Sequence, residues 1–329
     1  MEVVFFHRKR FPGNFSIESL FEQIRSALPQ TISCSVKELS FHSNGFFKRL
    51  YISFEAAFSQ KDINHVTGDV HFVSLFLKRK RTILTIHDLG FMNHPNRLAR
   101  MILKWFWLVL PVRSCAAITV VSEATKSDVL KWVGRRHESR IHVIYNPVKK
   151  GFVKMEKTFN ATEPVILQIG TRYNKNLIRL IQALSGISCK LLIVGEVPVA
   201  TTAELVSHAI KYETFKNLTD QELLEKYRVS DIVTFVSTHE GFGLPIIESN
   251  TIGRVVVTSN ISSMPEVAGN AAYLVDPFDV MSIRNGILRV IHDASHRQNL
   301  IENGYENGKR FDLTKIAKQY ESLYVSLQN

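Results

Sequence analysis

The chain has 329 residues, of which 45% are hydrophobic, and a mean hydropathy of −0.01. This length suits about two globular domains whose cores need neither disulfides nor metals. The three cysteines are scattered and odd in number, which argues against a disulfide framework and favours a reducing compartment. We expect no signal peptide, and the most apolar later segment, residues 101–110, contains Lys104 and is shorter than the roughly 20 residues of a membrane span.

Charge is unevenly distributed along the chain. Residues 1–150 carry 23 Lys and Arg against 11 Asp and Glu, a net charge of +12, whereas residues 151–329 carry a net charge of −1. A basic half suits an anionic membrane surface, a phosphate-bearing substrate or nucleic acid. A nucleic-acid partner would explain only the charge and no other feature of the sequence. The chain also lacks the aromatic-basic motifs of common RNA-binding modules, so we expect no nucleic-acid partner.

Strands and helices are expected to alternate in the first half. Apolar, β-branched runs predict strands, and apolar side chains three or four residues apart predict helices. The expected elements are strand 2–6, helix 16–28, a strand and a helix between 32 and 58, a short strand within 62–71, strand 81–86, a helix from 96 or 97 through 107, strand 117–121, a helix capped by Ser122, and strand 141–145. Residues 146–151 are interpreted as a linker. The aromatic segment 105–107 is expected to face the core, with a membrane-facing helix as the less favoured alternative.

The second half continues the alternation. The expected elements are strand 165–169, helix 176–184, strand 191–194, a helix opened by the capping box of Thr219 and Glu222, strand 232–235, helix 245–252, strands 255–258 and 272–275, helix 280–292 and two further helices. This order predicts an α/β fold with two doubly wound parallel sheets. Because such sheets bind ligands at their carboxyl edges, the two domains are expected to face a cleft.

Two carboxylates, Glu240 and Glu248, stand eight positions apart around a Gly-Phe-Gly-Leu-Pro turn, between strand 232–235 and helix 245–252. The glycines permit close backbone approach, and free N–H groups at a helix start suit an anion. A buried carboxylate that accepts two hydroxyls is a usual way to hold a ribose. The alternative is an ordinary turn residue and a solvated helix residue.

A second loop, residues 170–176, carries Arg172 and Lys175 between a strand and a helix. Cations at a helix start are disfavoured by the helix dipole unless an anion lies between them. The two side chains are therefore candidates to hold a diphosphate, and a solvated loop is the alternative.

Histidines give a weaker signal. His87 follows strand 81–86, where a satisfied core histidine is the alternative to a ligand contact, and His65 and His71 are more often structural or solvent-facing. The sequence has no cluster of His, Cys, Asp and Glu at zinc or iron spacing and no Asp-x-Asp pair, so we expect no metal.

Together these residues resemble the retaining glycosyltransferases of family 4, which have the GT-B fold. The resemblance covers nearly the whole chain and is strongest between residues 170 and 277. The matching segments are Gly170 with Lys175 and Asn176, the stretch from Glu240 to Glu248, and residues 262–267, 272–277, 86–89, 120–123 and 141–147.

The resemblance implies transfer of a sugar from a nucleotide-sugar with retention of its anomeric configuration, without a metal or other cofactor. It implies an acceptor-binding Rossmann-like domain over residues 1–150, a donor-binding Rossmann-like domain over 151–311, and a terminal helix, 312–329, that crosses back to the first domain. The implied catalytic residues are Glu240, His87, Arg172 and Lys175; the donor-binding residues are Gly170, Arg172, Lys175, Phe242, Gly243, Leu244 and Glu248; the acceptor-side residues are Gly13 and His65.

Each role follows from the resemblance. Glu248 would hold the ribose hydroxyls, Glu240 would lie beside the donor sugar, and His87 would contact that sugar from the first domain. Arg172 and Lys175 would neutralise the departing diphosphate, whose growing charge is the main chemical demand.

The chain departs from the family pattern at three places. The loop after Gly170 is shorter than usual, which puts the superposition of Arg172 on the family arginine in doubt. Ser249 and Asn250 replace the usual Ala-Met, and Arg254 replaces Pro or Thr, at positions expected to lie behind the site.

We therefore expect a hexosyltransferase of bacterial surface polysaccharide synthesis (O-antigen, capsule or exopolysaccharide), with GDP-mannose slightly favoured as donor and a glycan or lipid-linked acceptor. The basic first half predicts a cytoplasmic protein, peripheral at the inner face of the cytoplasmic membrane. The alternatives are a catalytically silent nucleotide-sugar-binding scaffold or sensor, and a nucleotide-sugar epimerase.

Overall fold

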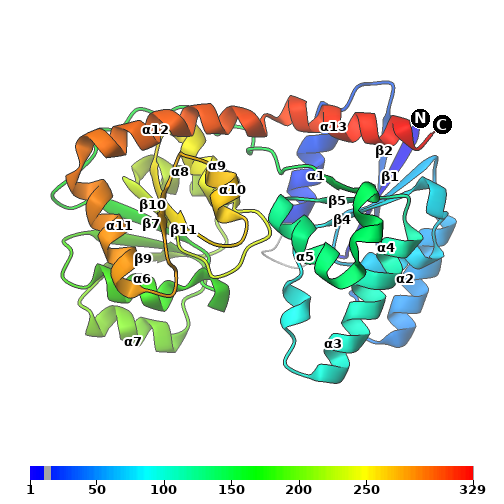
Figure 1. Cartoon of the computed structure of the whole chain (residues 1–329), viewed down its shortest axis with the longest axis horizontal. Helices are drawn as coiled ribbons and strands as arrows, with labels where there is room; N and C mark the ends of the chain where they lie inside the picture. Colours follow the sequence, from blue (N-terminus) through cyan, green and yellow to red (C-terminus); the bar gives the residue numbers. More distant parts are fainter. Residues whose placement is uncertain (11–15, 329) are drawn as a thin grey trace. The chain divides into compact units, whose positions relative to one another are not determined.

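The computed structural model describes residues 1–10 and 16–328 and divides into two compact units (Figure 1). Unit 1 contains residues 1–147 and the terminal segment from residue 313, and unit 2 contains residues 148–312. The sequence-based division was placed after residues 150 and 311. The predicted acceptor loop at Gly13 lies outside the described residues.

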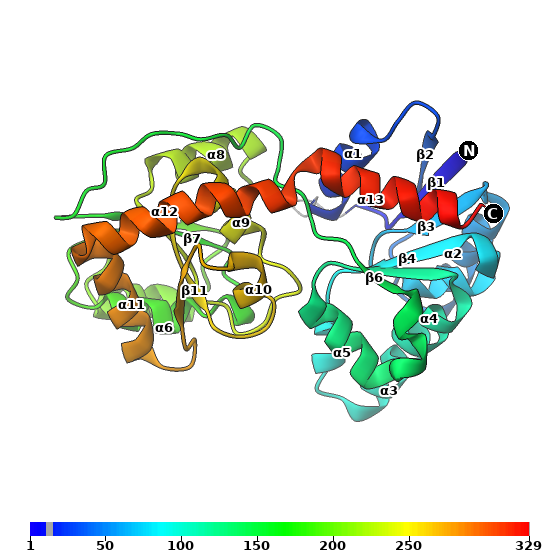
Figure 2. The same cartoon turned by 45° about the horizontal axis from the view of Figure 1, so that its top comes forward.

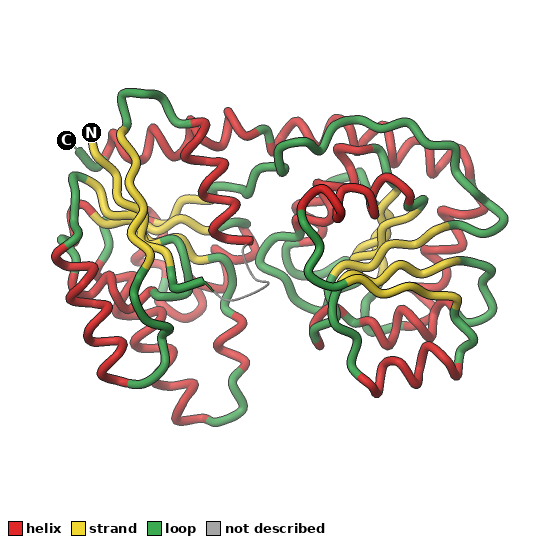
Figure 3. Tube along the Cα trace, turned by 180° about the vertical axis from the view of Figure 1, so that it is seen from behind, coloured by secondary structure: helices red, strands yellow, loops and turns green. Residues whose placement is uncertain are grey.

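Unit 1 contains a six-stranded sheet in the order β2-β1-β3-β4-β5-β6, in which every neighbouring pair is parallel. The strands are β1 (Glu2–His7), β2 (Ser33–Glu38), β3 (Ile63–Val66), β4 (Thr82–Ile86), β5 (Ala117–Val120) and β6 (Ile141–Val143). Strands β3, β4 and β5 are buried throughout, because helices cover both faces of the sheet (Figure 3), and this explains their continuous apolar sequence. The order reverses between β1 and β3, which makes that point of the carboxyl edge the expected ligand position.

Two groups of helices cover the faces of this sheet. They are α1 (Ser16–Ala27), α2 (Phe46–Phe58), α3 (Arg97–Leu103), α4 (Leu110–Ser114), α5 (Glu123–Val133) and α13 (Leu313–Ser326), with the short helices η1 (His71–Phe76), η2 (Arg79–Arg81), η3 (Gly90–Asn93), η4 (Lys104–Val109) and η5 (Arg135–Arg140). Helices α1 and α13 lie side by side (Figure 2) and share one core with Phe5 and Ile83. Helices α2, α4 and α5 share the opposite core with Phe6 and Leu84.

The aromatic segment 105–107 faces the core only in part. Trp107 is 8% exposed, its ring lies 4.8 Å from that of Phe72, and its indole N–H donates to the Asp69 carbonyl oxygen at 2.8 Å. Trp105 and Phe106 are 42% and 47% exposed. The prediction of a core-facing segment therefore holds for one of the three aromatic residues.

Unit 2 contains a second six-stranded parallel sheet, in the order β12-β11-β10-β7-β8-β9. The strands are β7 (Val165–Ile169), β8 (Lys190–Val194), β9 (Lys211–Phe215), β10 (Ile232–Phe235), β11 (Val255–Ser259) and β12 (Tyr273–Val275). The order reverses between β7 and β10, which are hydrogen-bonded neighbours. The predicted α/β class and the two doubly wound sheets are confirmed.

The helices of unit 2 are α6 (Leu177–Leu184), α7 (Val199–Ser207), α8 (Asp220–Val229), α9 (Leu244–Ile252), α10 (Met264–Ala268), α11 (Val280–His292) and α12 (Ala294–Gly308), with η6 (Tyr173–Lys175) and η7 (Lys309–Phe311). The predicted capping box opens α8: the Thr219 hydroxyl accepts from the Glu222 N–H, and the Glu222 carboxylate accepts from the Thr219 N–H. Helix α7 and strand β9 were not predicted. In the part of the chain that the structure describes, no helix has both the length and the apolar character to span a membrane.

Candidate active site

The two motif loops of unit 2 meet at the point where the strand order reverses. Residues 170–176 follow β7 and residues 236–243 follow β10. Since parallel neighbours end at the same edge, both loops lie at the carboxyl edge of the sheet, where open α/β sheets bind ligands.

Gly170 and Asn176 shape the first loop. Gly170 has φ +88°, and a Cβ there would lie 2.9–3.2 Å from carbons of the Lys175 side chain, so only glycine lets that side chain fold over the loop. Asn176 has φ 59°, and its amide donates to the carbonyl oxygens of Val236 at 3.0 Å and Pro277 at 2.7 Å. These bonds tie the first loop to the segments that follow β10 and β12.

Lys175 and Glu240 form an ion pair between the two loops. The Lys175 Nζ lies 2.7 Å from Glu240 Oε1 and 4.6 Å from the centre of the Phe235 ring. The Asn174 amide donates to the same carboxylate oxygen at 2.9 Å and to the His239 carbonyl oxygen at 3.0 Å. The two charged side chains are 19% and 15% exposed, so the pair is largely screened from water while still open to a ligand. The sequence predicted both residues but not their contact.

Arg172 is exposed and stands immediately before the η6 turn. Its carbonyl oxygen accepts from the Lys175 N–H at 2.8 Å, so its position in the loop is fixed relative to Lys175. The predicted cations are thus brought to one loop, with Lys175 turned toward Glu240.

Two serines support the Glu240 loop from the segment after β11. The Ser262 hydroxyl donates to the Glu240 carbonyl oxygen at 2.7 Å, and the Ser263 hydroxyl donates to the same oxygen at 3.0 Å and to the Phe242 carbonyl oxygen at 2.7 Å. Both serines belong to a segment that matches the family pattern, residues 262–267, in which the sequence assigned them no role. Their position indicates that they set the conformation of the loop.

The Gly-Phe-Gly turn places backbone, rather than the Phe242 side chain, at the start of α9. Phe242 is 5% exposed, and its ring packs against Phe311 with 5.6 Å between centres. Gly243 has φ +117°, where a Cβ would lie 3.0 Å from a carbon of Ile246. The first turn of α9 begins at Leu244, and backbone N–H groups at such a start suit an anion.

Glu248 lies in the middle of α9 and is 3% exposed. The Tyr227 hydroxyl donates to its Oε2 at 2.5 Å, and the Lys149 Nζ lies 4.0 Å from its Oε1 and 2.8 Å from Asp220 Oδ1. Burial raises the pKa of Glu248, while the Lys149 charge and the Tyr227 hydrogen bond act in the opposite direction. The sequence predicted Glu248, but the Lys149 segment was interpreted as a linker and Tyr227 was given no role.

Two of the three departures from the family pattern have structural explanations. The Ser249 hydroxyl donates to the Pro245 carbonyl oxygen at 2.6 Å, and the Asn250 amide donates to the Ala271 carbonyl oxygen at 3.1 Å. The buried Arg254 guanidinium donates to several carbonyl oxygens, including that of Tyr227 at 3.1 Å. These side chains therefore hold the backbone behind Glu248, and their identities do not alter the groups at the edge.

In unit 1, His87 follows β4, and its Nε2 lies 2.9 Å from the Thr67 carbonyl oxygen. A carbonyl can only accept, so Nε2 carries the hydrogen. Burial lowers the pKa of His87, so the ring is neutral at pH 7 and its Nδ1 is an acceptor. A neutral acceptor of this kind suits a sugar hydroxyl better than an anion.

His65 requires a correction. It is 0% exposed, and its ring nitrogens lie 2.8 Å from the Tyr324 hydroxyl and 2.7 Å from the Thr85 hydroxyl. Because both ring nitrogens have protein partners, His65 joins α13 to the sheet and is not available to contact the sugar acceptor predicted for it. His71 is also buried, and its Nδ1 lies 2.6 Å from the Trp107 carbonyl oxygen.

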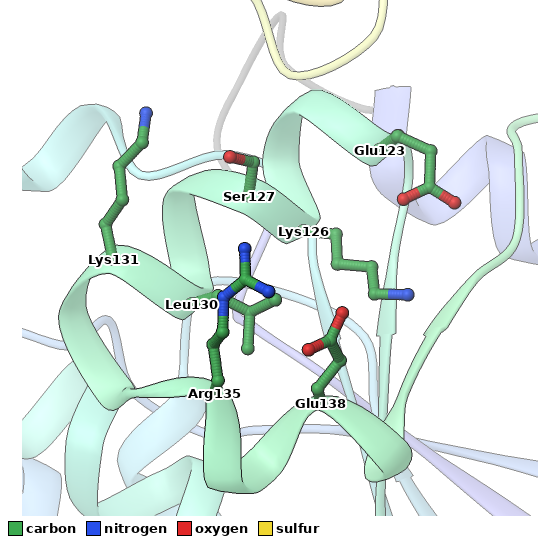
Figure 4. Close-up of a pocket in the computed structure, with 7 residues that line it drawn as sticks. All are labelled: Glu123, Lys126, Ser127, Leu130, Lys131, Arg135 and Glu138. Atoms are coloured by element: carbon green, nitrogen blue, oxygen red, sulfur yellow. The ribbon is translucent and has the colours of Figure 1, made fainter.

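Two hollows lie among the described residues of unit 1. The first, of about 330 Å³, lies near the reversal between β1 and β3 and is lined by Arg8, Lys9, His42, Ser43, Asn44, Asp69, Val70, Leu103 and Trp107. The second, of about 420 Å³, lies over α5 and η5 (Figure 4) and is lined by Glu123, Lys126, Ser127, Leu130, Lys131, Arg135 and Glu138. The first hollow is the better acceptor candidate, because it adjoins the carboxyl edge and combines cations with an aromatic wall.

Comparisons with known proteins agree with this architecture. The family model "Glycosyl transferases group 1" matches residues 150–307, and the model "Glycosyltransferase Family 4" matches residues 30–150. The structure is similar to that of Anabaena HepE in complex with UDP and glucose, with a TM-score of 0.78, 17% identity, and 99% and 100% of the two chains covered.

Two curated relatives are mannosyltransferases of O-antigen chains. O-antigen chain mannosyltransferase B of Escherichia coli is 36% identical over 108 residues, which is 33% of this chain and 28% of that protein. O-antigen chain mannosyltransferase RfbU of Salmonella typhimurium is 29% identical over 234 residues, which is 68% of this chain and 65% of that protein. The matches thus span less than two thirds of each relative. The two family models, the fold and the paired-glutamate loop together show that the chain belongs to the GT-B glycosyltransferases of the family 4 type.

Proposed function

We propose that this protein transfers a hexosyl group from a nucleotide-sugar to a glycan or lipid-linked acceptor, with retention of the anomeric configuration. The observation that carries the proposal is the Lys175–Glu240 ion pair at the reversal point of the unit 2 sheet. Glu240 stands eight residues before the buried Glu248. This arrangement offers separate groups to the sugar, the diphosphate and the ribose of a single donor.

The donor is divided among three groups in this proposal. Glu248 accepts hydroxyls of the ribose, with its Oε2 fixed by Tyr227 and its Oε1 facing Lys149. The N–H groups at the start of α9 and the cations Arg172 and Lys175 face the diphosphate. Glu240 accepts hydroxyls of the sugar. The names of the two O-antigen relatives support GDP-mannose as the donor to be tested first.

Front-face substitution is the mechanism that we propose. The C1–O bond to the diphosphate breaks, the acceptor hydroxyl oxygen forms a new bond to C1 on the same face, and a phosphate oxygen takes the hydroxyl proton. Lys175, already held at the edge by Glu240, compensates the charge that gathers on the leaving diphosphate. In this scheme the protein's own cations take the part that a divalent metal has elsewhere, and no cofactor is required.

The biological setting follows from the same relatives. We propose synthesis of a bacterial surface polysaccharide, on an acceptor presented at the cytoplasmic face of the inner membrane. The basic half of the chain supports this setting, because lipid-linked acceptors lie on an anionic surface.

A panel of nucleotide-sugars with purified protein tests the proposal. Thermal shift first identifies the donor, since a ligand at 100 times its Kd adds about 2.7 kcal/mol of stability. Transfer to an oligosaccharide acceptor, and the configuration of the product by NMR, are then measured with and without EDTA. Tight binding with neither transfer nor donor hydrolysis would show a silent scaffold or sensor instead, and an inverted product would contradict front-face substitution.

A further inference from the structure

Helix α2 is apolar on two opposite faces. Its inner face consists of Ile52, Ser53 and Ala56, which are buried against unit 1. At about 3.6 residues per turn, Phe47, Tyr51, Phe54 and Phe58 fall within an arc of about 60° directly opposite that face. A helix at a water-facing surface ordinarily carries polar residues there.

The outer aromatic stripe of α2 is strongly exposed. Phe47 is 83% exposed, Tyr51 57%, Phe54 48% and Phe58 88%, and the adjacent Phe46 is 71% exposed. Helix α2 lies at the outer edge of unit 1 in Figures 1 and 2. A contiguous exposed aromatic surface of this kind marks an interaction site rather than scattered surface residues.

Cations adjoin the C-terminal end of the stripe. The ring of Phe76 lies 5.4 Å from that of Phe54, and the Lys78 N–H donates to the Gln60 side chain just after α2 at 2.7 Å. From this contact begins the run Lys78, Arg79, Lys80 and Arg81, in which all four side chains are exposed. Lys48 is exposed near the other end of the helix.

We propose that the outer face of α2 and the 78–81 run dock unit 1 on an anionic lipid bilayer. The helix lies in the plane of the interface, its aromatic rings enter the boundary between headgroups and acyl chains, and the cations contact lipid phosphates. A second copy of the chain is a poorer occupant, because its cations would face those of the first. The proposal deepens the proposed function, since it names the surface by which the enzyme reaches a lipid-linked acceptor.

Vesicle flotation without donor or acceptor tests the surface separately from catalysis. Two kinds of vesicle are used, phosphatidylcholine alone and phosphatidylcholine mixed with phosphatidylglycerol. The wild type is expected to bind the mixed vesicles, with binding that weakens as salt is raised. The aromatic variant Phe47→Ser/Tyr51→Ser/Phe58→Ser and the charge variant Lys78→Gln/Arg79→Gln/Lys80→Gln are each expected to bind at least about tenfold more weakly.

Matched controls separate this surface from overall charge and apolarity. Lys126→Gln/Lys131→Gln/Arg135→Gln removes three cations from the hollow over α5, and Val199→Ser/Val206→Ser removes two exposed apolar side chains from α7. Both controls are expected to bind vesicles within about twofold of the wild type. All substituted side chains are at least partly exposed, so the fold is expected to persist, as circular dichroism will check.

The outcomes decide between occupants. Undiminished flotation of both α2-side variants would overturn the proposal. A further variant, Leu98→Ser/Trp105→Ser, alters the exposed apolar side of α3 and η4. Loss of vesicle binding in this variant, while the α2 variants still bind, would also overturn the proposal. A dimer seen by analytical ultracentrifugation, abolished by the aromatic variant and accompanied by no vesicle binding, would show a self-association surface instead. Transfer to a water-soluble acceptor should be equal in wild type and α2 variants, so failure of docking and failure of the transferase assignment remain distinguishable.

Discussion

The two sheet edges of this protein hold their polar groups in different ways. At the reversal point of unit 2, charged side chains are paired across loops: Lys175 with Glu240, and Lys149 with Asp220 and Glu248. At the edge of the unit 1 sheet, a hollow combines the cations Arg8 and Lys9 with Asp69, which is paired with Arg8. The histidine that follows β4, His87, is neutral and bonded to a carbonyl oxygen. Unit 2 therefore offers paired charges to its ligand, whereas unit 1 offers the neutral acceptor nitrogen of His87 as well as cations.

The largest effect is expected at Glu240. Replacing it by Gln removes the carboxylate that neighbours Lys175 and, in the proposed mechanism, the donor sugar, so kcat should fall by about 10²–10³-fold. Nucleotide binding should change by less than about threefold, because Glu240 is not assigned to the nucleotide. Steady-state kinetics and calorimetry measure the two quantities. The control is Glu213→Gln, an exposed carboxylate paired with Lys190 on β8; equal losses in both variants would refute a special role for Glu240.

Lys175→Gln should lower kcat by about 10²-fold, since it removes a cation placed for the leaving diphosphate. The effect should not add to that of Glu240→Gln, because the two side chains lie 2.7 Å apart and each is left without its partner by the other's loss. A double-mutant cycle on kcat/KM measures the coupling. Strict additivity would mean that the ion pair is irrelevant to the reaction.

Acidification should weaken nucleotide binding through Glu248. Burial raises the pKa of this carboxyl, so it becomes protonated at a higher pH than an ordinary glutamate and loses acceptor capacity as the pH falls. By linkage, Glu248 contributes more to the free energy of unfolding as the pH falls from above its raised folded-state pKa toward its lower unfolded-state pKa. Titration calorimetry of GDP and UDP across pH should show the loss.

The variant Glu248→Gln should show weaker binding by about tenfold at pH 7 and a flatter pH profile, since it cannot titrate. Tyr227→Phe keeps the carboxylate but removes the hydrogen bond to Oε2, and should lower stability by about 1–3 kcal/mol. If the pH profile of Glu248→Gln matched the wild type, another group would have to be responsible.

The smallest effect on activity is expected from Tyr324→Phe in unit 1. This change leaves a buried nitrogen of His65 without its hydroxyl partner and should lower the free energy of unfolding by about 1–3 kcal/mol. Turnover should stay within about twofold of the wild type, because His65 does not reach a ligand. Denaturant unfolding and kcat provide the test, and a large loss of kcat with unchanged stability would restore His65 as a functional residue.

The sequence predicted the buried parallel strands and the motif loops well, for physical reasons. Strands such as β4 and β10 are covered on both faces, so they appear as unbroken apolar runs. Strand β9 was missed because it lies at the sheet edge, where Lys211 and Glu213 are exposed and the apolar signal is weak. Helix α7 was missed with it, since no side-chain cap marks its start.

The site was predictable where its chemistry is local in sequence and not where it depends on folding. Glu240 and Glu248 are marked by their spacing around a glycine turn. Lys149, in contrast, is 99 positions from Glu248, and only the packing of the connecting segment brings them together. The burial of His65 could not be predicted from a sequence pattern either, because its partner, Tyr324, lies in the distant helix α13.

That helix has a consequence for how the protein is made. Residues 148–312 are contiguous and can fold as soon as they leave the ribosome, but the core around Phe5 and Phe21 is completed by α13 residues such as Tyr320 and Tyr324. The strands of unit 1 therefore wait for α13, which is synthesised after the whole of unit 2, before their sheet is fully covered on that face. During this interval the nascent unit 1 exposes aromatic surface, which makes it prone to aggregation until α13 packs onto it.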